Sequence, residues 1–455
     1  MKIGIIGGGI SGVSAAFFLS NRLSKENKEF KITLFEKQEK LGGVIDTVTK
    51  GDFTVEAGPN GFLDSKPHTL MLVEEAGLKD KLYRSNDKAR KRYIMRDKNL
   101  IQLPDKPGKF LTSEILSFKG KLRVLKEFFI PAKKDEKDET IADFARRRLG
   151  PEACDYLISP MVSGIFAGDP EKMSLKSSFP VIYNLEREYG GLFRGMIKKK
   201  NKKSGPAGPG GVLTSYSGGL INLVYDVANK CKNLEIKLKC PVESIQKNGN
   251  IFEVNTETEK FEFDYIIVTS QAQASAAFLK DLSEKLSDEL LKIPYAPAFV
   301  TGLGFESKDV LDPLDGFGYL IPAKENKKIL GALFTSSIFP ERAKNGKKLI
   351  RVIMGGDRHR WILEKTDEEL LEIAFNEIKD TLKIEGEPIS RIYFKWENAI
   401  PQYYVGHSKI IENIENELNR IKNIYIGGNM LYGIGINDCT RVSYEIAEKI
   451  VTSLK

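Results

Sequence analysis

Histidine and cysteine are scarce in this chain of 455 residues. The three histidines, His68, His359 and His407, are far apart in the sequence, and the four cysteines form no CxxC pair and show no zinc spacing. We therefore expect no metal site and reduced thiols. A Ser-His-Asp hydrolase has no support either, because no GxSxG sequence is present.

Long hydrophobic runs are also lacking. No apolar stretch reaches the roughly 18–20 residues that cross a bilayer. The N-terminus, MKIGIIGGGI, reads as a strand and turn rather than a signal peptide, so we expect a cytoplasmic protein. The apolar fraction of 41% and charged fraction of 29% are those of a globular protein. The length predicts two or three domains rather than one core.

Strong charge of one sign is missing as well. The net charge is +8, and basic residues gather at 88–98 (KARKRYIMRDK) and 197–205 (IKKKNKKSG). Solvated loops are one explanation of these runs, and contact with an anionic membrane surface or an acidic substrate is the other. Nothing besides the charge indicates nucleic-acid binding.

A glycine-rich turn follows the first strand. The apolar stretch KIGII leads directly into Gly7-x-Gly9-x-x-Gly12, and 13–23 reads as a helix. This is the dinucleotide fingerprint in its strand–turn–helix context. Gly7 allows the tight turn, Gly9 lets backbone approach a pyrophosphate, and Gly12 lets helix and strand pack closely. The predicted contacts are Gly7, Gly8, Gly9, Ile10, Ser11 and Gly12.

The next strand, FKITLFEK (30–37), ends in an acidic residue that can accept hydrogen bonds from both ribose hydroxyls and would repel a 2′-phosphate. Lys40-Leu41-Gly42-Gly43 and the turn-rich 53–67 then extend the site in the manner of flavoproteins, which favours FAD over NAD. An adenine could be gripped by the backbone at 242, although a core residue explains that position equally well. The predicted contacts are Glu36, Lys37, Gly42, Gly43, Ala57, Gly58, Pro59, Asn60 and Val242.

The remaining chain divides by its periodicity. Helical spacing dominates 66–200, and the glycine–proline-rich 204–211 predicts a flexible connection. The segment 234–270 reads as strands with a hairpin at 248–250. Residues 290–400 contain further strands and one helix at 367–383.

A second glycine-rich turn, GNMLYGIGINDC (428–439), lies near the C-terminus. We expect 424–427 to join the first sheet, and a helix capped by Asn437 or Asp438 to aim its N-terminus at the isoalloxazine of the same FAD. The positive helix end would stabilise the reduced flavin. The predicted contacts are Gly428, Asn429, Ile434, Gly435 and Ile436.

Several segments together resemble the protoporphyrinogen oxidase family of the FAD-dependent, monoamine-oxidase-like superfamily. They run from end to end of the chain and are GGGISG (7–12), EAGPNGFLDSKP (56–67), SGIFAGDPEKMSLKSSFP (163–180), YAPAFVTGLGF (295–305), GFGYLIP (316–322), ENAIPQYYVGH (397–407) and GNMLYGIGINDC (428–439).

The resemblance implies an α/β fold, α+β overall. It has a discontinuous Rossmann-like FAD-binding domain, an α+β substrate-binding domain, and a helical domain that can associate with a membrane. The expected ranges are 1–65, 212–290 and 420–455 for FAD, 66–97 and 291–419 for substrate, and 98–211 for the helices.

The implied activity is the six-electron oxidation of protoporphyrinogen IX to protoporphyrin IX in haem biosynthesis. It acts on CH–CH groups, with oxygen as acceptor and hydrogen peroxide as product. Coproporphyrinogen III is the alternative substrate. The resemblance also implies substrate contacts but no acid–base pair, because the flavin carries the chemistry. Those contacts are Arg92 for a propionate, Phe317 and Leu320 against the pyrroles, and Gly164 and Gly168 for close backbone approach.

Other classes remain open from the sequence. An FAD amine oxidase needs an aromatic pair at the flavin, and a carotenoid desaturase needs a long apolar tunnel; GFGYLIP argues against both. A non-catalytic FAD-binding sensor is the third alternative. The expected partners are the porphyrinogen and molecular oxygen. Three further contacts stay open: peripheral contact with the cytoplasmic face of a membrane, transfer of the product to the next haem-pathway enzyme, and formation of a homodimer. No nucleic-acid partner is expected.

Overall fold

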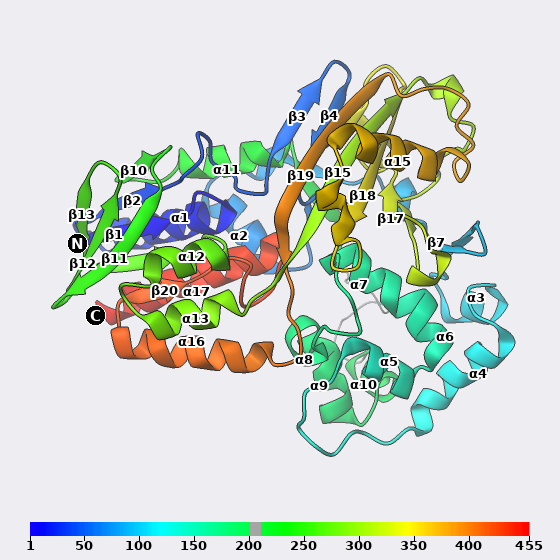
Figure 1. The fold of residues 1–455 in the computed structure, drawn as a ribbon, viewed down its shortest axis with the longest axis horizontal. Helices are drawn as coiled ribbons and strands as arrows, with labels where there is room; N and C mark the ends of the chain where they lie inside the picture. The colour runs from blue at the N-terminus through cyan, green and yellow to red at the C-terminus, as the bar shows by residue number, and fades with distance from the viewer. Residues whose placement is uncertain (201–210, 455) are drawn as a thin grey trace.

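A computed structural model describes residues 1–200 and 211–454. Figure 1 shows three regions: a parallel sheet with its helices around the N-terminus, a large mostly antiparallel sheet, and a cluster of short helices below that sheet. The predicted glycine–proline connection lies mostly outside the described residues. In the part of the chain that is described, no helix is both long and apolar enough to cross a membrane.

The first sheet is fully parallel and collects strands from three distant parts of the chain. Its central strands are apolar on both faces, as parallel strands covered on both sides must be. In order across the sheet, the strands are β10 (Leu234–Lys237), β2 (Lys31–Phe35), β1 (Lys2–Ile6), β14 (Tyr265–Val268) and β20 (Ile424–Ile426).

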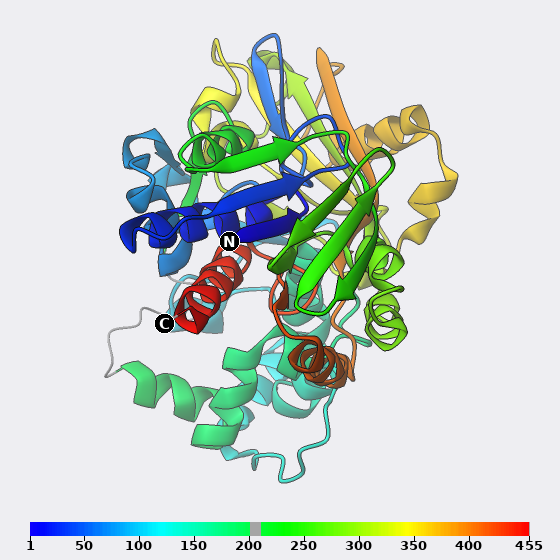
Figure 2. The same ribbon diagram turned by 90° about the vertical axis from the view of Figure 1, so that its left-hand side faces the viewer.

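Helices from both ends of the chain cover one face of this sheet and share one hydrophobic core with it. The C-terminal helix packs along the N-terminal one, as Figure 2 shows from the side. These helices are α1 (Ile10–Lys25), α2 (Pro67–Glu75), α11 (Leu220–Ala228) and α17 (Ile436–Ser453).

The opposite face is covered by an antiparallel ribbon and three further helices, which form a second core. The ribbon contains the hairpin predicted at 248–250. Its strands are β11 (Val242–Asn248), β12 (Ile251–Thr256) and β13 (Lys260–Phe263), and the helices are α12 (Ala272–Leu279), α13 (Glu284–Leu291) and α16 (His407–Ile421). Helix α16 was missed at the sequence level, although its apolar residues recur at helical spacing.

The second sheet has seven strands, and one face packs against α15 (Asp367–Lys379). A capping box between Thr366 and Glu369 starts that helix. In order, the strands are β19 (Ser390–Pro401), β15 (Tyr295–Phe305), β18 (Lys348–Gly355), β17 (Ile329–Leu333), β16 (Gly318–Leu320), β7 (Arg92–Arg96) and β8 (Asn99–Gln102).

Short ribbons and turns connect the two sheets. The strands are β3 (Thr47–Lys50) with β4 (Phe53–Glu56), and β5 (Phe62–Leu63), β9 (Leu213–Tyr216) and β6 (Leu82–Arg84). The single turns are η1 (Lys79–Lys81), η2 (Asp87–Arg90), η5 (Ser307–Asp309), η6 (Ala323–Glu325), η7 (Pro340–Arg342), η8 (Arg360–Glu364) and the short helix α14 (Thr335–Ile338). The expectation that 66–200 is mainly helical is wrong for 82–102, where β6, β7 and β8 pair with distant strands.

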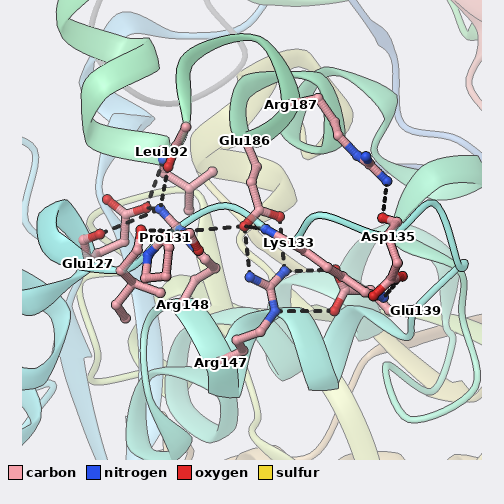
Figure 3. Close-up of polar contacts among 12 residues, drawn as sticks. Glu127, Pro131, Lys133, Asp135, Glu139, Arg147, Arg148, Glu186, Arg187 and Leu192 are labelled. Atoms are coloured by element: carbon pink, nitrogen blue, oxygen red, sulfur yellow. Dashed lines mark hydrogen bonds and ion pairs between the residues drawn. The ribbon is translucent and has the colours of Figure 1, made fainter.

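The helical region follows β8. Its elements are α3 (Pro107–Thr112), α4 (Phe118–Leu125), η3 (Lys126–Phe129), α5 (Ile141–Arg148), α6 (Pro151–Ala153), the π-helical turn η4 (Cys154–Ile158), α7 (Ser159–Phe166), α8 (Leu175–Ser178), α9 (Pro180–Tyr189) and α10 (Leu192–Lys200). An ion network joins several of these short elements (Figure 3). At its centre the fully buried Arg148 contacts Glu127 and Glu186, which come from η3 and α9. The division into three domains stays a prediction.

Candidate functional site

The N-terminal glycine turn lies at the carboxyl end of β1, in the centre of the parallel sheet. The Gly7 N–H donates to the Phe35 carbonyl at 2.8 Å, and the Thr269 hydroxyl donates to the Gly7 carbonyl at 3.0 Å. Gly7 has a φ of +113°, which favours glycine, and Gly9 is the N-cap of α1. The first turn of α1 contains no acidic residue. This helix end therefore presents backbone N–H groups and a positive dipole to an anion.

Glu36 lies directly after β2 and binds the glycine turn. Its side chain is only 8% exposed, and it accepts hydrogen bonds from the Gly8 N–H at 2.7 Å and the Gln38 N–H at 2.9 Å. Carboxylate oxygens have further lone pairs for a ribose hydroxyl. The Gly42 N–H donates to the Gly8 carbonyl at 2.9 Å, so the second predicted glycine pair lies beside the first turn.

Two other predicted residues near Glu36 differ in their placement. The Cys240 N–H donates to the Glu36 carbonyl at 3.0 Å, which brings the start of β11 at Val242 close to the end of β2. Lys37 is exposed to solvent. The structure therefore places Val242 near Glu36 and leaves the Lys37 side chain in solvent.

The segment 57–60 leaves β4 and runs over the second sheet, which holds it by its carbonyl groups. The Trp396 indole donates to the Ala57 carbonyl at 3.2 Å, and the Arg351 guanidinium donates to the Gly58 carbonyl. The Asn60 side-chain amide nitrogen is buried without a hydrogen-bond partner. An unpaired buried donor is costly, so it marks a place where a ligand acceptor fits.

The second glycine turn is fixed by a tyrosine that sequence reasoning assigned no role. The Tyr403 hydroxyl donates to the Asn429 carbonyl and accepts the Gly433 N–H at 3.0 Å. Burial raises the pKa of Tyr403 well above its ordinary value, so the hydroxyl stays neutral. Its ring stacks on His407 with the ring centres 4.2 Å apart. The only available signal was the IPQYY segment.

Helix α17 begins at Ile436, and its N-cap is Gly435 without a side-chain cap bond. The predicted capping by Asn437 or Asp438 is therefore wrong. Both side chains have other partners: the Asn437 amide donates to the Leu63 carbonyl at 3.0 Å, and Asp438 pairs with Lys66 at 2.9 Å. No side chain caps the first turn, and the Asp438 N–H donates to the Gly435 carbonyl at 2.9 Å, so the N–H groups of Ile436 and Asn437 are the ones that a ligand could accept from.

The predicted substrate residues lie on or opposite the second sheet. Arg92, at the start of β7, is exposed and stands over the Phe317 ring at 5.4 Å. Gly164, in α7, faces Leu320: a methyl group added to it would come within 2.7 Å of the Leu320 side chain. The sheet and α7 therefore approach one another at this glycine.

Gly168 lines a separate cavity. This cavity of about 320 Å³ is also lined by Ser163, Arg358, His359 and Trp361. The residues lining this cavity include none from the two glycine-rich turns, and none of Arg92, Phe317 and Leu320. The structure does not bring Gly168 to the other predicted substrate residues in that cavity.

Comparison with known proteins identifies the family. The model of flavin-containing amine oxidoreductases matches residues 10–451. The chain belongs to this family. The protein is therefore a flavin-dependent oxidoreductase, in a fold that combines a Rossmann-like sheet with a second sheet and helices. Within the described residues, no group of three or more histidine, cysteine or acidic side chains is arranged to hold a metal ion.

Two relatives match nearly the whole chain. The coproporphyrinogen III oxidase of Bacillus subtilis is 30% identical over 448 residues, covering 96% of this chain and 94% of its own. Protoporphyrinogen oxidase 2 of Arabidopsis thaliana is 28% identical over 490 residues, covering 100% and 94%. The resemblance to porphyrinogen oxidases seen in the sequence is confirmed.

Two solved structures share the fold. An Exiguobacterium protein, provisionally assigned as a protoporphyrinogen oxidase, superposes with a TM-score of 0.85 at 24% identity and 99% coverage of both chains. Cyclohexylamine oxidase from Brevibacterium oxydans reaches 0.68 at 15% identity, covering 100% of this chain and 99% of its own.

The residues present fit a flavin. The Gly9 α-carbon is open: an added methyl group would find only the Gly42 carbonyl, at 3.7 Å. Two uncapped helix starts, an orphaned Asn60 donor and a buried Glu36 acceptor provide groups for both phosphate and sugar. These groups come from segments at opposite ends of the chain, since Gly9 and Gly435 cap the first and the last of these helices.

Proposed function

We propose that the protein is an FAD-dependent porphyrinogen oxidase. It would carry out the six-electron oxidation of a porphyrinogen to its porphyrin, with protoporphyrinogen IX as the substrate that the sequence resemblance implies, reducing three molecules of oxygen to three of hydrogen peroxide. The observation that supports the proposal is an apolar face of the second sheet, with the exposed Arg92 at its edge and Arg351 of the same sheet bonded to the Gly58 carbonyl of segment 57–60. The names of the relatives support the same chemistry. Coproporphyrinogen III is the second candidate, favoured by a buried arginine on that face.

The bound FAD would supply the hydride acceptor. The chain's own residues bind and orient it. Gly7–Gly12 and the start of α1 would hold the pyrophosphate, Glu36 the ribose, and Ala57–Asn60 with Gly428–Ile436 the flavin end. The N-terminus of α17 would stabilise negative charge there. Phe317 and Leu320 would support the macrocycle, and Arg92 would bind a carboxylate in the bidentate geometry of a guanidinium.

The activity assay is direct. Purified protein with a flavin absorption spectrum is mixed anaerobically with each reduced porphyrinogen, and flavin bleaching is followed. Admission of oxygen should restore the spectrum and release fluorescent porphyrin. Bound flavin that neither porphyrinogen bleaches would refute the proposal and favour the amine oxidase or sensor alternatives.

Arg92→Ala should raise the KM for porphyrinogen about 10- to 100-fold, because a hydrogen-bonded charge contact contributes about 1.5–3 kcal/mol. Flavin content and kcat should remain near the wild-type values, since Arg92 lies at the exposed start of β7. The measurement is a steady-state titration with porphyrin fluorescence as the signal.

The matched control is Arg90→Ala, because Arg90 is a nearby exposed arginine whose side chain pairs with Asp87. This control should leave KM unchanged. If Arg92→Ala and Arg90→Ala gave the same KM, the carboxylate contact would be wrong.

The helical region is our proposed site of peripheral contact with an anionic membrane. On α4 and η3, Phe118 is 75% exposed and Phe129 is 79% exposed, which is unusual for large apolar side chains. Lysines of the same segment, Lys119, Lys121 and Lys126, would meet lipid phosphates. Such contact would place a cytoplasmic enzyme, as a monomer or homodimer, beside the next haem-pathway enzyme.

Phe118→Ser combined with Phe129→Ser should abolish cosedimentation with phosphatidylglycerol vesicles and leave the flavin spectrum unchanged. Leu291→Ser, at an exposed leucine of α13, is the control and should sediment like wild type. Wild-type protein that stays in the supernatant would argue against membrane contact.

A further inference from the structure

A row of paired residues crosses the second sheet from Arg92 to Arg351, which is bonded to segment 57–60. Arg351 on β18 pairs with Leu333 on β17, Leu333 pairs with Gly318 on β16, and Gly318 pairs with Arg92 on β7. Directly paired residues point to the same face of a sheet. Because neighbouring strands are about 4.8 Å apart, the backbones of Arg92 and Arg351 are about 14 Å apart across three spacings.

The face that carries this row is apolar and only partly covered by the elements packed on it. Phe317, Leu320, Leu333 and Ile353 are partly exposed there, and Gly318 adds no side chain between the two arginines. The opposite face of the same strands is closed, since Tyr319, Ala332 and Val352 are at most 1% exposed and pack into the core below α15. This side of the sheet thus combines apolar side chains with a cation at each end of the row.

The cation at the inner end lacks a counter-ion of its own. Arg351 is 4% exposed, its Nε is buried without a partner, and its donor bond goes to the neutral Gly58 carbonyl. The nearby buried Glu56 pairs with Arg342 at 2.8 Å. Two arginines and one glutamate leave one net positive charge in this cluster.

This charge persists at neutral pH. Burial lowers the pKa of Arg351 to about 10, which still leaves the guanidinium protonated. Burying an unpaired charge costs several kcal/mol, so this arrangement favours an anionic ligand group beside Arg351.

We propose that Arg351 binds a second carboxylate of the porphyrinogen, opposite the one bound by Arg92, and thereby selects the tetracarboxylate coproporphyrinogen III. The inference rests on the proposed function. Protoporphyrinogen IX carries its two propionates on adjacent rings and vinyl groups on the other two. With those propionates at Arg92, the opposite edge would offer Arg351 only vinyl groups. Coproporphyrinogen III carries a propionate on every ring and offers a carboxylate to both arginines.

The test compares Arg351→Met with wild-type holoenzyme. Coproporphyrin III and protoporphyrin IX, the stable oxidised rings, are titrated by fluorescence quenching, and oxidation of both porphyrinogens is measured. Arg351→Met should weaken coproporphyrin III binding at least about tenfold and raise the KM for coproporphyrinogen III equally. Affinity for protoporphyrin IX should stay the same or increase. Thermal stability should be kept or increased, because an unpaired buried charge is replaced by an apolar side chain.

The control is Arg391→Met. Arg391 is on β19, two strands away from β18 in the same sheet, but its side chain pairs with Glu372 of α15 behind the sheet, so the substrate face is untouched. An unchanged preference between the two rings in Arg351→Met would overturn the inference. Equal loss for both rings together with loss of flavin would also overturn it, because Arg351 would then only support the 57–60 segment. If wild type oxidises neither porphyrinogen, the proposed function fails, while the titration still decides whether Arg351 selects tetracarboxylates.

Discussion

Gly12→Ala should give a protein that retains almost no flavin. The added methyl carbon would lie 2.0 Å from the Gly7 carbonyl oxygen and 3.0 Å from the Thr269 hydroxyl. The first of these neighbours is backbone of the glycine turn itself, so it cannot move aside without changing the turn. Overpacking of this kind costs about 1–3 kcal/mol in folding, and the displaced turn no longer presents its N–H groups to a pyrophosphate.

Gly9→Ala separates the loss of flavin binding from the loss of folding stability. Its added methyl group would meet only the Gly42 carbonyl at 3.7 Å, which is ordinary contact. The apoprotein should therefore fold with wild-type stability. Flavin should still be lost, because the methyl group would occupy the space over which a phosphate approaches the backbone.

Flavin absorbance per protein and thermal unfolding of the apoproteins measure these effects. Gly12→Ala should lower both quantities, and Gly9→Ala should lower the first alone. Gly108→Ala, in α3, has nothing within 4 Å of the added methyl group and should change neither. Full flavin occupancy in Gly9→Ala would mean that the pyrophosphate is not held at this turn.

The glycine turns were predictable because their evidence is local. A strand, three glycines at fixed spacing and a helix define the first turn within 25 residues. Glu36 follows from the same βαβ pattern, and the return of 424–426 to the same sheet follows from a buried strand before a second glycine turn.

The role of Arg351 was not predictable in this way. Its environment depends on the register of β18 against β17 and on the distant segment 57–60. In the sequence KLIRVIMGG it is a single charge in an apolar strand, and this pattern does not show which face the side chain takes. The capping error at α17 has a similar origin, because Lys66 and the Leu63 carbonyl, which engage Asp438 and Asn437, are about 370 residues away in sequence.

Arg148→Ala should destabilise the helical region by about 3–5 kcal/mol, since removing one partner from a buried ion pair leaves the other charge uncompensated. Arg148 and Glu127 are both fully buried. The Arg148 guanidinium also donates to the Ile130 carbonyl at 2.9 Å and contacts Glu186 at 3.3 Å. Its loss would leave several acceptors unpaired in a region of short helices with few long-range sheet contacts.

The neighbouring Arg146 provides the comparison. It lies in the same turn of α5, but its pair with Glu171 is exposed on both sides, so Arg146→Ala should cost no more than about 1 kcal/mol. Chemical denaturation followed by tyrosine fluorescence, together with limited proteolysis within 98–200, would measure both variants. Equal stability of the two variants would contradict the assignment of the buried network as the main support of this region.

The same network predicts acid sensitivity of the helical region. Burial opposes ionisation of Glu186, but hydrogen bonds and charge from Arg147, together with the charge of Arg148, outweigh it and lower the pKa of Glu186 below 4.5. A carboxyl group whose folded pKa is depressed stabilises the fold above its unfolded pKa and loses that contribution as pH falls through the folded value. Wild type should therefore lose stability below about pH 4.5, the unfolded value. In Arg148→Ala the pH-dependent loss should be smaller and should be complete at a higher pH, because the folded pKa of Glu186 moves closer to the unfolded value once one of its two cationic partners is gone.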